Sequence, residues 1–128
     1  MATISRLYEG WTRADLDLAL EQLDPGIVWT AIEGAPDAGT YVGREGARAY
    51  MQDWLDDFDL HGNDIEEAIE AGDDRLVCVQ RARGTGRASG VETELHYTCV
   101  YTFRGERLGE VHEYATRAEA LRAVGLPE

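Results

Sequence analysis

The sequence lacks lysine altogether. Its twelve cationic side chains are all arginine and face twenty-five aspartates and glutamates, which gives a formal net charge of −13. Without lysine the chain can form neither a Schiff base nor the phosphate contact of a P-loop. Its arginines are scattered from Arg6 to Arg122, whereas binding to phosphate groups needs clustered positive charge. We therefore expect no nucleic-acid partner and no membrane partner.

Cysteine, histidine and long apolar runs are also scarce. Cys78 and Cys99 each lie in a short apolar run, which is typical of a small buried side chain rather than a disulfide. Without a CxxC motif, and with the three histidines far apart, we expect no metal and no cofactor. No apolar run approaches the roughly eighteen residues of a membrane span, and the N-terminus lacks signal-peptide features. These absences predict a cytoplasmic protein.

The residues that are present predict one packed domain over 1–128. The chain is 44% hydrophobic and has three Trp, six Tyr and two Phe, enough for a core and for a cavity within it.

The first half of the sequence shows mostly helical periodicity. Apolar residues at i, i+3, i+4 and i+7 predict helices over 4–11 and 16–23, the second ended by an Asp-Pro-Gly turn. β-Branched and aromatic residues predict a strand over 27–32, and turn residues predict a loop over 33–40. The strongest helical pattern covers 43–58 and has one apolar and one charged face.

The second half reads as strands joined by short turns. We predict strands over 64–70, 75–83, 92–103 and 107–115, followed by a short helix over 116–124 that opens with a capping box. Four consecutive strands with short connections predict an antiparallel meander. The fold class is therefore α+β: a curved sheet wraps over a long helix and leaves a cone, which is a plausible pocket.

Alternation along the strand over 92–103 predicts which side chains face the helices. The odd-numbered positions are uniformly apolar or aromatic and should face inward: Leu95, Tyr97, Cys99, Tyr101 and Phe103. Tyr97 and Tyr101 are pocket candidates, since a Tyr hydroxyl among apolar neighbours needs a partner and a ligand oxygen would serve. For Trp29 the parity is ambiguous, because either Trp29 or Thr30 could face inward.

Several motifs, in this order and spacing, resemble the SnoaL-like family of the NTF2-like superfamily. They are LYEGW (7–11), DPGIVW (24–29), YVGREGA (41–47), GTGRASG (84–90), VHEY (111–114) and RAEAL (117–121). That superfamily also holds ketosteroid isomerase, polyketide cyclases, limonene epoxide hydrolase and scytalone dehydratase. The resemblance implies an NTF2-like cone in which N-terminal helices pack into a curved antiparallel or mixed sheet. It also implies a pocket on the concave face and a homodimer through the convex face, where Arg81 and Arg83 would meet acidic neighbours or the partner.

The same resemblance argues against ketosteroid isomerase chemistry. Aligned from Asp24, the position of the isomerase base falls on Thr30, which cannot act as a base, and the second acid falls on Cys99. The tyrosine of the first helix falls on Leu7, with Tyr8 one place away.

Polyketide cyclases, by comparison, use one acidic residue in an apolar cavity, and Glu113 is the candidate here. The family pattern, run back from Tyr114, places Val111, Glu113 and Ala115 inward, and it places Glu110 and His112 outward. Burial raises the pKa of a carboxyl and suits it to proton transfer near neutral pH. The alternative is a structural carboxylate tied to an arginine or to a tyrosine hydroxyl.

The sequence thus predicts a pocket for a small, largely apolar or cyclic molecule, in which Glu113 is the catalytic candidate. Trp11 and Trp54 are candidates for the pocket or for plain core packing. The residues that we expect to contact a ligand are Tyr8, Trp11, Trp29, Trp54, Tyr97, Cys99, Tyr101 and Val111. The alternative function is a non-catalytic module that binds a small molecule or acts as a dimerising accessory subunit.

Overall fold

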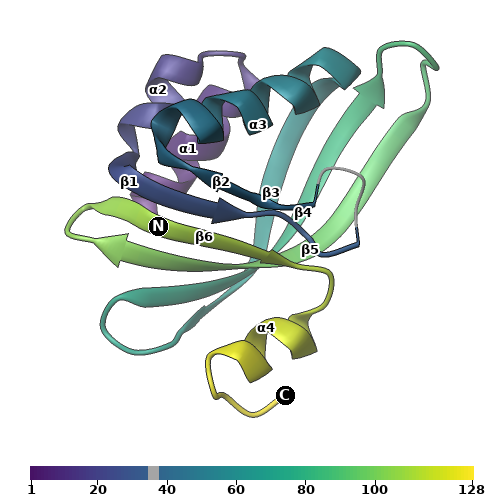
Figure 1. Ribbon diagram of the computed structural model, residues 1–128. Coiled ribbons are helices and arrows are strands. Elements are labelled where there is room, and N and C mark those ends of the chain that lie inside the picture. The colour runs from purple at the N-terminus through teal and green to yellow at the C-terminus, as the bar shows by residue number, and fades with distance from the viewer. Residues whose placement is uncertain (35–37) are drawn as a thin grey trace.

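The computed structural model describes residues 1–34 and 38–128, and its first three helices gather on one side of a large sheet (Figure 1). Residues 35–37 of the loop predicted over 33–40 lie outside the described residues. The elements, in chain order, are α1 (Ala2–Thr12), α2 (Leu16–Glu21), β1 (Leu23–Thr30), β2 (Thr40–Val42), α3 (Gly43–Asp57), β3 (Phe58–Glu70), β4 (Arg75–Gly86), β5 (Glu92–Arg104), β6 (Arg107–Tyr114) and α4 (Arg117–Ala123).

The six strands form one mixed sheet in the order β2-β1-β6-β5-β4-β3. Strands β3 to β6 pair with their neighbours in antiparallel fashion, so the predicted meander is confirmed. The pairing of β1 with β6 is parallel and sets Trp29 beside Val111. This α+β architecture matches the predicted class, and none of the described helices has the length and apolar character needed to cross a bilayer.

Several element boundaries differ from the prediction. The long helix ends at Asp57, and β3 begins at Phe58 instead of residue 64, because backbone pairing with β4 extends through a stretch without alternation. Strand β1 begins at Leu23, since its first residues pair with β6 despite the Asp-Pro-Gly turn, at the cost of an irregular register. The short strand β2 was not predicted, because three residues carry too little pattern.

The concave face of the sheet meets α1, α2 and α3 and forms the main core. Tyr97, Cys99 and Tyr101 are buried there, as the alternation predicted. The ambiguity in β1 is resolved, because Trp29 is fully buried in this core whereas Thr30 is only partly buried. The prediction that Ala115 faces inward is wrong: Ala115 is exposed, because β6 ends at Tyr114.

Helix α4 covers part of the convex face, on the other side of the sheet from α1 to α3 (Figure 1). A second core cluster forms there, in which Val77 and Val100 of the sheet pack with Ala120 and Leu121 of α4. The N-cap predicted at Thr116 is confirmed, since the Thr116 hydroxyl accepts a hydrogen bond from the Glu119 amide at 3.2 Å.

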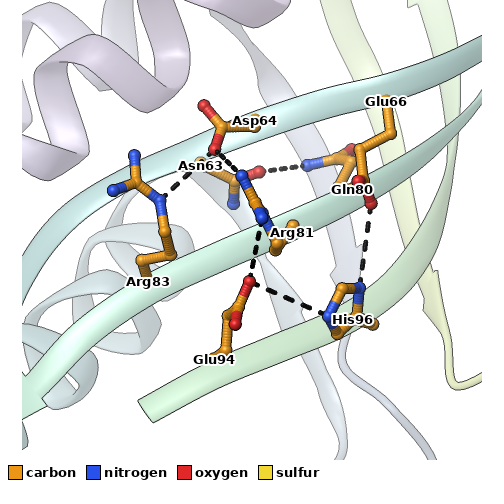
Figure 2. Close-up of polar contacts among 8 residues, drawn as sticks. All are labelled: Asn63, Asp64, Glu66, Gln80, Arg81, Arg83, Glu94 and His96. Carbon is orange, nitrogen blue, oxygen red and sulfur yellow. Dashed lines mark hydrogen bonds and ion pairs between the residues drawn. The ribbon is translucent and has the colours of Figure 1, made fainter. Parts of the chain in front are cut away.

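The rest of the convex face carries a ladder of charged side chains (Figure 2). Arg81 lies between Asp64 at 3.0 Å and Glu94 at 3.1 Å, and Glu94 is also 3.9 Å from His96. Arg81 therefore meets acidic neighbours, as expected, and it holds the pKa of Asp64 below its ordinary value. These groups are largely exposed, so the ladder contributes little to stability.

Helices α1 and α2 approach each other closely at Gly10. A Cβ at this position would lie 2.6 Å from the backbone nitrogen of Ala19 and 2.8 Å from the carbonyl oxygen of Asp15. Only glycine fits such an approach without a backbone shift. Because Tyr8 and Trp11 flank Gly10 on α1, this contact also fixes where both aromatic side chains enter the core.

Substitution Gly10→Ala should therefore destabilise the protein, even though alanine is the better helix former. We expect the free energy of unfolding to fall by about 1–3 kcal/mol, the usual cost of overpacking, measured by urea denaturation. Glu9→Ala, at the exposed neighbouring position, should change it by less than about 0.5 kcal/mol. Equal stability of Gly10→Ala and the wild type would contradict the steric constraint.

Candidate functional site

A cavity of about 300 Å³ lies between the helices and the concave face of the sheet. Its wall is mostly apolar and aromatic, with a few polar side chains, which is the usual make-up of a small-molecule pocket. The lining residues are Tyr8, Trp11, Thr12, Ile32, Tyr50, Trp54, Phe58, Leu60, Gly62, Asn63, Ala82, Arg83, Gly84, Thr93, Leu95, Tyr97 and Glu113.

Glu113 of β6 places a buried carboxylate on this wall, with 6% of its surface exposed. The Trp29 indole N–H donates to Glu113 Oε2 at 3.1 Å, and the Tyr50 hydroxyl donates to Glu113 Oε1 at 2.8 Å. Both donors are neutral. They satisfy a buried carboxylate and orient it without placing a positive charge on it.

The rings around Glu113 pack against one another. The Trp29 ring lies 5.9 Å from Trp11 in an edge-on arrangement and 5.8 Å from Tyr50. The Trp11 indole donates to the Met51 carbonyl oxygen at 3.2 Å, and its ring stacks on Tyr8. Such packing leaves little freedom to the two side chains that hold the carboxylate.

A second cluster of polar side chains lies on the β3–β5 side of the core and has Gln80 of β4 at its centre. The Tyr8 and Tyr101 hydroxyls are 2.6 Å apart, and the Tyr101 hydroxyl donates to the Gln80 side-chain oxygen. The Gln80 amide donates to Asn63 Oδ1 at 2.9 Å and to the Tyr97 hydroxyl at 3.3 Å (Figure 2 shows the Asn63 contact). The Asn63 amide also donates to the Tyr97 hydroxyl.

Burial raises the pKa of Tyr8, Tyr97 and Tyr101 well above the ordinary value of a tyrosine, chiefly through desolvation. All three hydroxyls therefore keep their protons at neutral pH. In this cavity the tyrosines act as hydrogen-bonding groups and not as bases.

The structure separates the predicted site residues into two sets. Glu113 lines the cavity together with four of the residues expected to contact a ligand: Tyr8, Trp11, Trp54 and Tyr97. The other four, which are Trp29, Cys99, Tyr101 and Val111, are buried in the core behind the lining. Their direct contact with a ligand stays a prediction, although Trp29 and Tyr101 bond to groups next to the cavity.

Several polar residues of the site were not predicted as such, among them Tyr50, Asn63 and Gln80. Tyr50 lies on the apolar face of the predicted long helix, and no pattern shows that its hydroxyl reaches β6. Asn63 falls just before the predicted strand over 64–70, where alternation is absent. The pairing of Asn63 with Ala82 gives it the side of the sheet that faces the cavity.

Of the positions aligned with the isomerase, Leu7 is fully buried, and Thr30 and Cys99 are not part of the cavity lining. Among the described residues, no three His, Cys, Asp or Glu side chains converge as metal ligands do.

The fold and this site define an α+β protein with a buried acid, Glu113, on the wall of an aromatic cavity. A SnoaL-like domain model matches residues 4–111, and the chain belongs to the SnoaL-like family. No curated protein matches the sequence significantly.

Solved structures share the fold at low sequence identity. A hypothetical protein from Catenulispora acidiphila DSM 44928, with a ketosteroid isomerase-like fold and bound trimethylamine, is 17% identical, with a TM-score of 0.76 over 98% of this chain and 93% of that chain. A candidate polyketide cyclase from Xanthomonas campestris pv. campestris is also 17% identical, with a TM-score of 0.72 over 96% and 94%. TerC, co-crystallised with polyporic acid, is 19% identical, with a TM-score of 0.74 over 97% and 96%.

Cys78 of β4 and Cys99 of β5 lie opposite each other in the sheet. Both are free thiols, as predicted. Burial raises the pKa of Cys78 to about 11 and also raises that of Cys99. Since the thiolate is the reactive form, we expect 5,5′-dithiobis(2-nitrobenzoate) to react very slowly with the folded protein at pH 8 and with both thiols after guanidinium denaturation. Rapid reaction of the folded protein would contradict their placement.

Proposed function

We propose that the protein is a SnoaL-like proton-transfer enzyme, cyclase- or isomerase-like, that acts on a small, largely apolar cyclic or polyketide-like molecule. Glu113 exchanges the proton with a carbon or oxygen atom of the substrate. The observation that carries the proposal is the position of this carboxylate: it is buried, it lies on the wall of an aromatic cavity, and it is fixed by Trp29 and Tyr50.

The chemistry follows from that environment. Because Trp29 and Tyr50 hold the Glu113 carboxylate in one orientation on the cavity wall, a substrate bound beside it would meet a fixed proton acceptor. A fixed general base beside a bound substrate contributes about 10²–10⁴-fold to the rate of a proton transfer. The cavity volume of about 300 Å³ suits a compound of one to three rings.

The structural neighbours support a small-molecule ligand in general terms. One was crystallised with trimethylamine and another with polyporic acid, so this fold accommodates compounds of different sizes. Neither compound is assigned to this chain.

Non-catalytic binding is the second candidate, and one observation favours it. Glu113 receives two hydrogen bonds from core side chains, as a carboxylate that only anchors the last strand would. In that case the cavity would hold a metabolite without changing it.

The two functions differ in what Glu113→Gln does to proton exchange. As a probe we choose the carbon acid 2-tetralone in D₂O and follow deuterium incorporation next to the carbonyl by NMR. We expect the wild type to accelerate exchange and Glu113→Gln to lower the acceleration at least about 100-fold, while affinity for 2-tetralone persists. Glu110→Gln, on the same strand but exposed, is the matched control. An exchange rate that is unchanged in Glu113→Gln would refute the catalytic role.

We also propose that the protein is a homodimer that associates through the convex face beyond α4. The charged ladder of this face would then be partly buried, so Arg81→Glu should weaken the dimer by at least about tenfold, read by sedimentation velocity over a concentration series. Arg13→Glu, at the exposed residue that follows α1, should leave association unchanged. A wild type that stays monomeric at all concentrations would contradict the proposal. A cytoplasmic location stays a prediction.

A further inference from the structure

Gln80 is a buried polar residue behind the cavity wall that has no part in the proposed reaction. Its side chain is fully buried, yet every polar atom of its amide group has a partner. An amide differs from a carboxylate or an alkyl chain in having one end that only accepts hydrogen bonds and another that only donates. Gln80 can therefore impose a direction on the hydroxyls around it.

On the accepting side, a chain of hydrogen bonds runs from Tyr8 at the cavity through Tyr101 to the side-chain oxygen of Gln80. The Tyr101 hydroxyl donates its only proton to Gln80 Oε1. In the contact of 2.6 Å between the Tyr8 and Tyr101 hydroxyls, Tyr8 must then be the donor. The Tyr8 oxygen, on the cavity wall, keeps its capacity to accept a hydrogen bond.

On the donating side, the Gln80 amide nitrogen gives its protons away, so Tyr97 accepts a hydrogen bond where Tyr101 donates one. The Tyr97 oxygen accepts one hydrogen bond from Gln80 Nε2 and one from Asn63 Nδ2. The Asn63 amide is itself oriented, because its oxygen accepts the other proton of Gln80 Nε2. With both acceptor sites of Tyr97 occupied by N–H groups, its own proton must be donated, either toward the Tyr8 oxygen, which contacts Tyr97 and can accept, or toward a group in the cavity.

The Tyr97 hydroxyl keeps this proton at neutral pH. Burial raises its pKa well above the ordinary value, even though contacts with Asn63 and Tyr8 act in the opposite direction. Tyr97 also lines the cavity, so the proton is available to a group inside it. A ligand oxygen in the cavity would therefore compete with the Tyr8 oxygen for the Tyr97 proton.

We propose that Gln80 orients Tyr97 as a hydrogen-bond donor for a ligand oxygen, so that the cavity selects cyclic compounds that carry a carbonyl or another acceptor oxygen over the matching hydrocarbons. The proposal rests on the proposed function in one respect: the cavity of Glu113 binds a small cyclic molecule. It makes Gln80 a positioning residue and Tyr97 the residue that determines specificity.

The test compares the binding of 2-tetralone and tetralin, which differ by a carbonyl oxygen, in titrations followed by tryptophan fluorescence. We expect the wild type to prefer 2-tetralone and Tyr97→Phe to weaken 2-tetralone about 3- to 10-fold while leaving tetralin unchanged. Gln80→Glu should have the same effect, because a carboxylate at this position accepts the Tyr97 proton and withdraws it from the cavity. Tyr114→Phe on the convex face and Gln52→Glu on the exposed face of α3 are the matched controls.

The infrared carbonyl band of bound 2-tetralone gives a readout that a merely structural role would not move. It should lie at lower wavenumber in the wild type than in a hydrocarbon solvent, and it should return toward the solvent value in Tyr97→Phe. If both amides were turned over, the Tyr97 proton would go to Asn63 and the band would not shift. That result, or a wild type without preference for 2-tetralone, would overturn the proposal.

These measurements need no turnover, so they separate the two proposals. If Glu113→Gln loses proton exchange but still prefers 2-tetralone to tetralin, the results support Glu113 as the base and Tyr97 as the donor independently. If exchange depends on Glu113 but the wild type shows no preference for 2-tetralone, Glu113 remains the base and the role of Tyr97 as a donor is refuted. Because Tyr97→Phe deletes a single oxygen, its result decides the matter even if Gln80→Glu does not fold.

Discussion

A carboxylate can be buried in an apolar core only if hydrogen-bond donors meet it there, and this requirement for Glu113 connects the separate parts of the structure. One donor, Trp29, comes from β1 and the other, Tyr50, from α3. The parallel pairing of β1 with β6 brings the first into reach, and the packing of α3 under the sheet brings the second. The site thus depends on contacts between residues far apart in the sequence.

The cavity has two polar regions that differ in character. At Glu113 a negatively charged group accepts hydrogen bonds from fixed donors. Around Gln80 an entirely neutral network divides donors from acceptors, so that Tyr97 and Tyr8 face the cavity with opposite hydrogen-bonding capacity. A pocket of this kind can orient a molecule that is apolar over most of its surface, because a few directed groups set its position.

Much of the fold followed from local patterns in the sequence. The long helix, the four-strand meander and the inward face of β5 each have a strong periodicity, and the capping box at Thr116 marks the start of α4. The boundaries at Phe58 and Leu23 did not follow, because there backbone pairing with a neighbouring strand extends the strand where the side chains do not alternate. The side of Trp29 was undecidable for a related reason: a short strand supports either parity until its partners are known.

The site was predictable only where a resemblance or an alternation pointed to it. Glu113 and Tyr97 came from such patterns. The roles of Tyr50, Asn63 and Gln80 arise from hydrogen bonds between residues 17 to 63 positions apart, which no spacing rule expresses. Strand parity places a side chain inside the cone, but it does not decide whether that side chain borders the cavity or packs behind it. For this reason the prediction did not separate the lining residues from the four that pack behind them, which are Trp29, Cys99, Tyr101 and Val111.

The central claim is that a small cyclic molecule occupies the cavity with its reacting atom beside Glu113. A crystal structure of the protein soaked with 2-tetralone tests this most directly. The account predicts density for the ring system in the aromatic cavity, with the acidic carbon next to the ketone facing the Glu113 carboxylate. An ordered 2-tetralone bound away from Glu113, or a cavity that stays closed to it, would contradict the account.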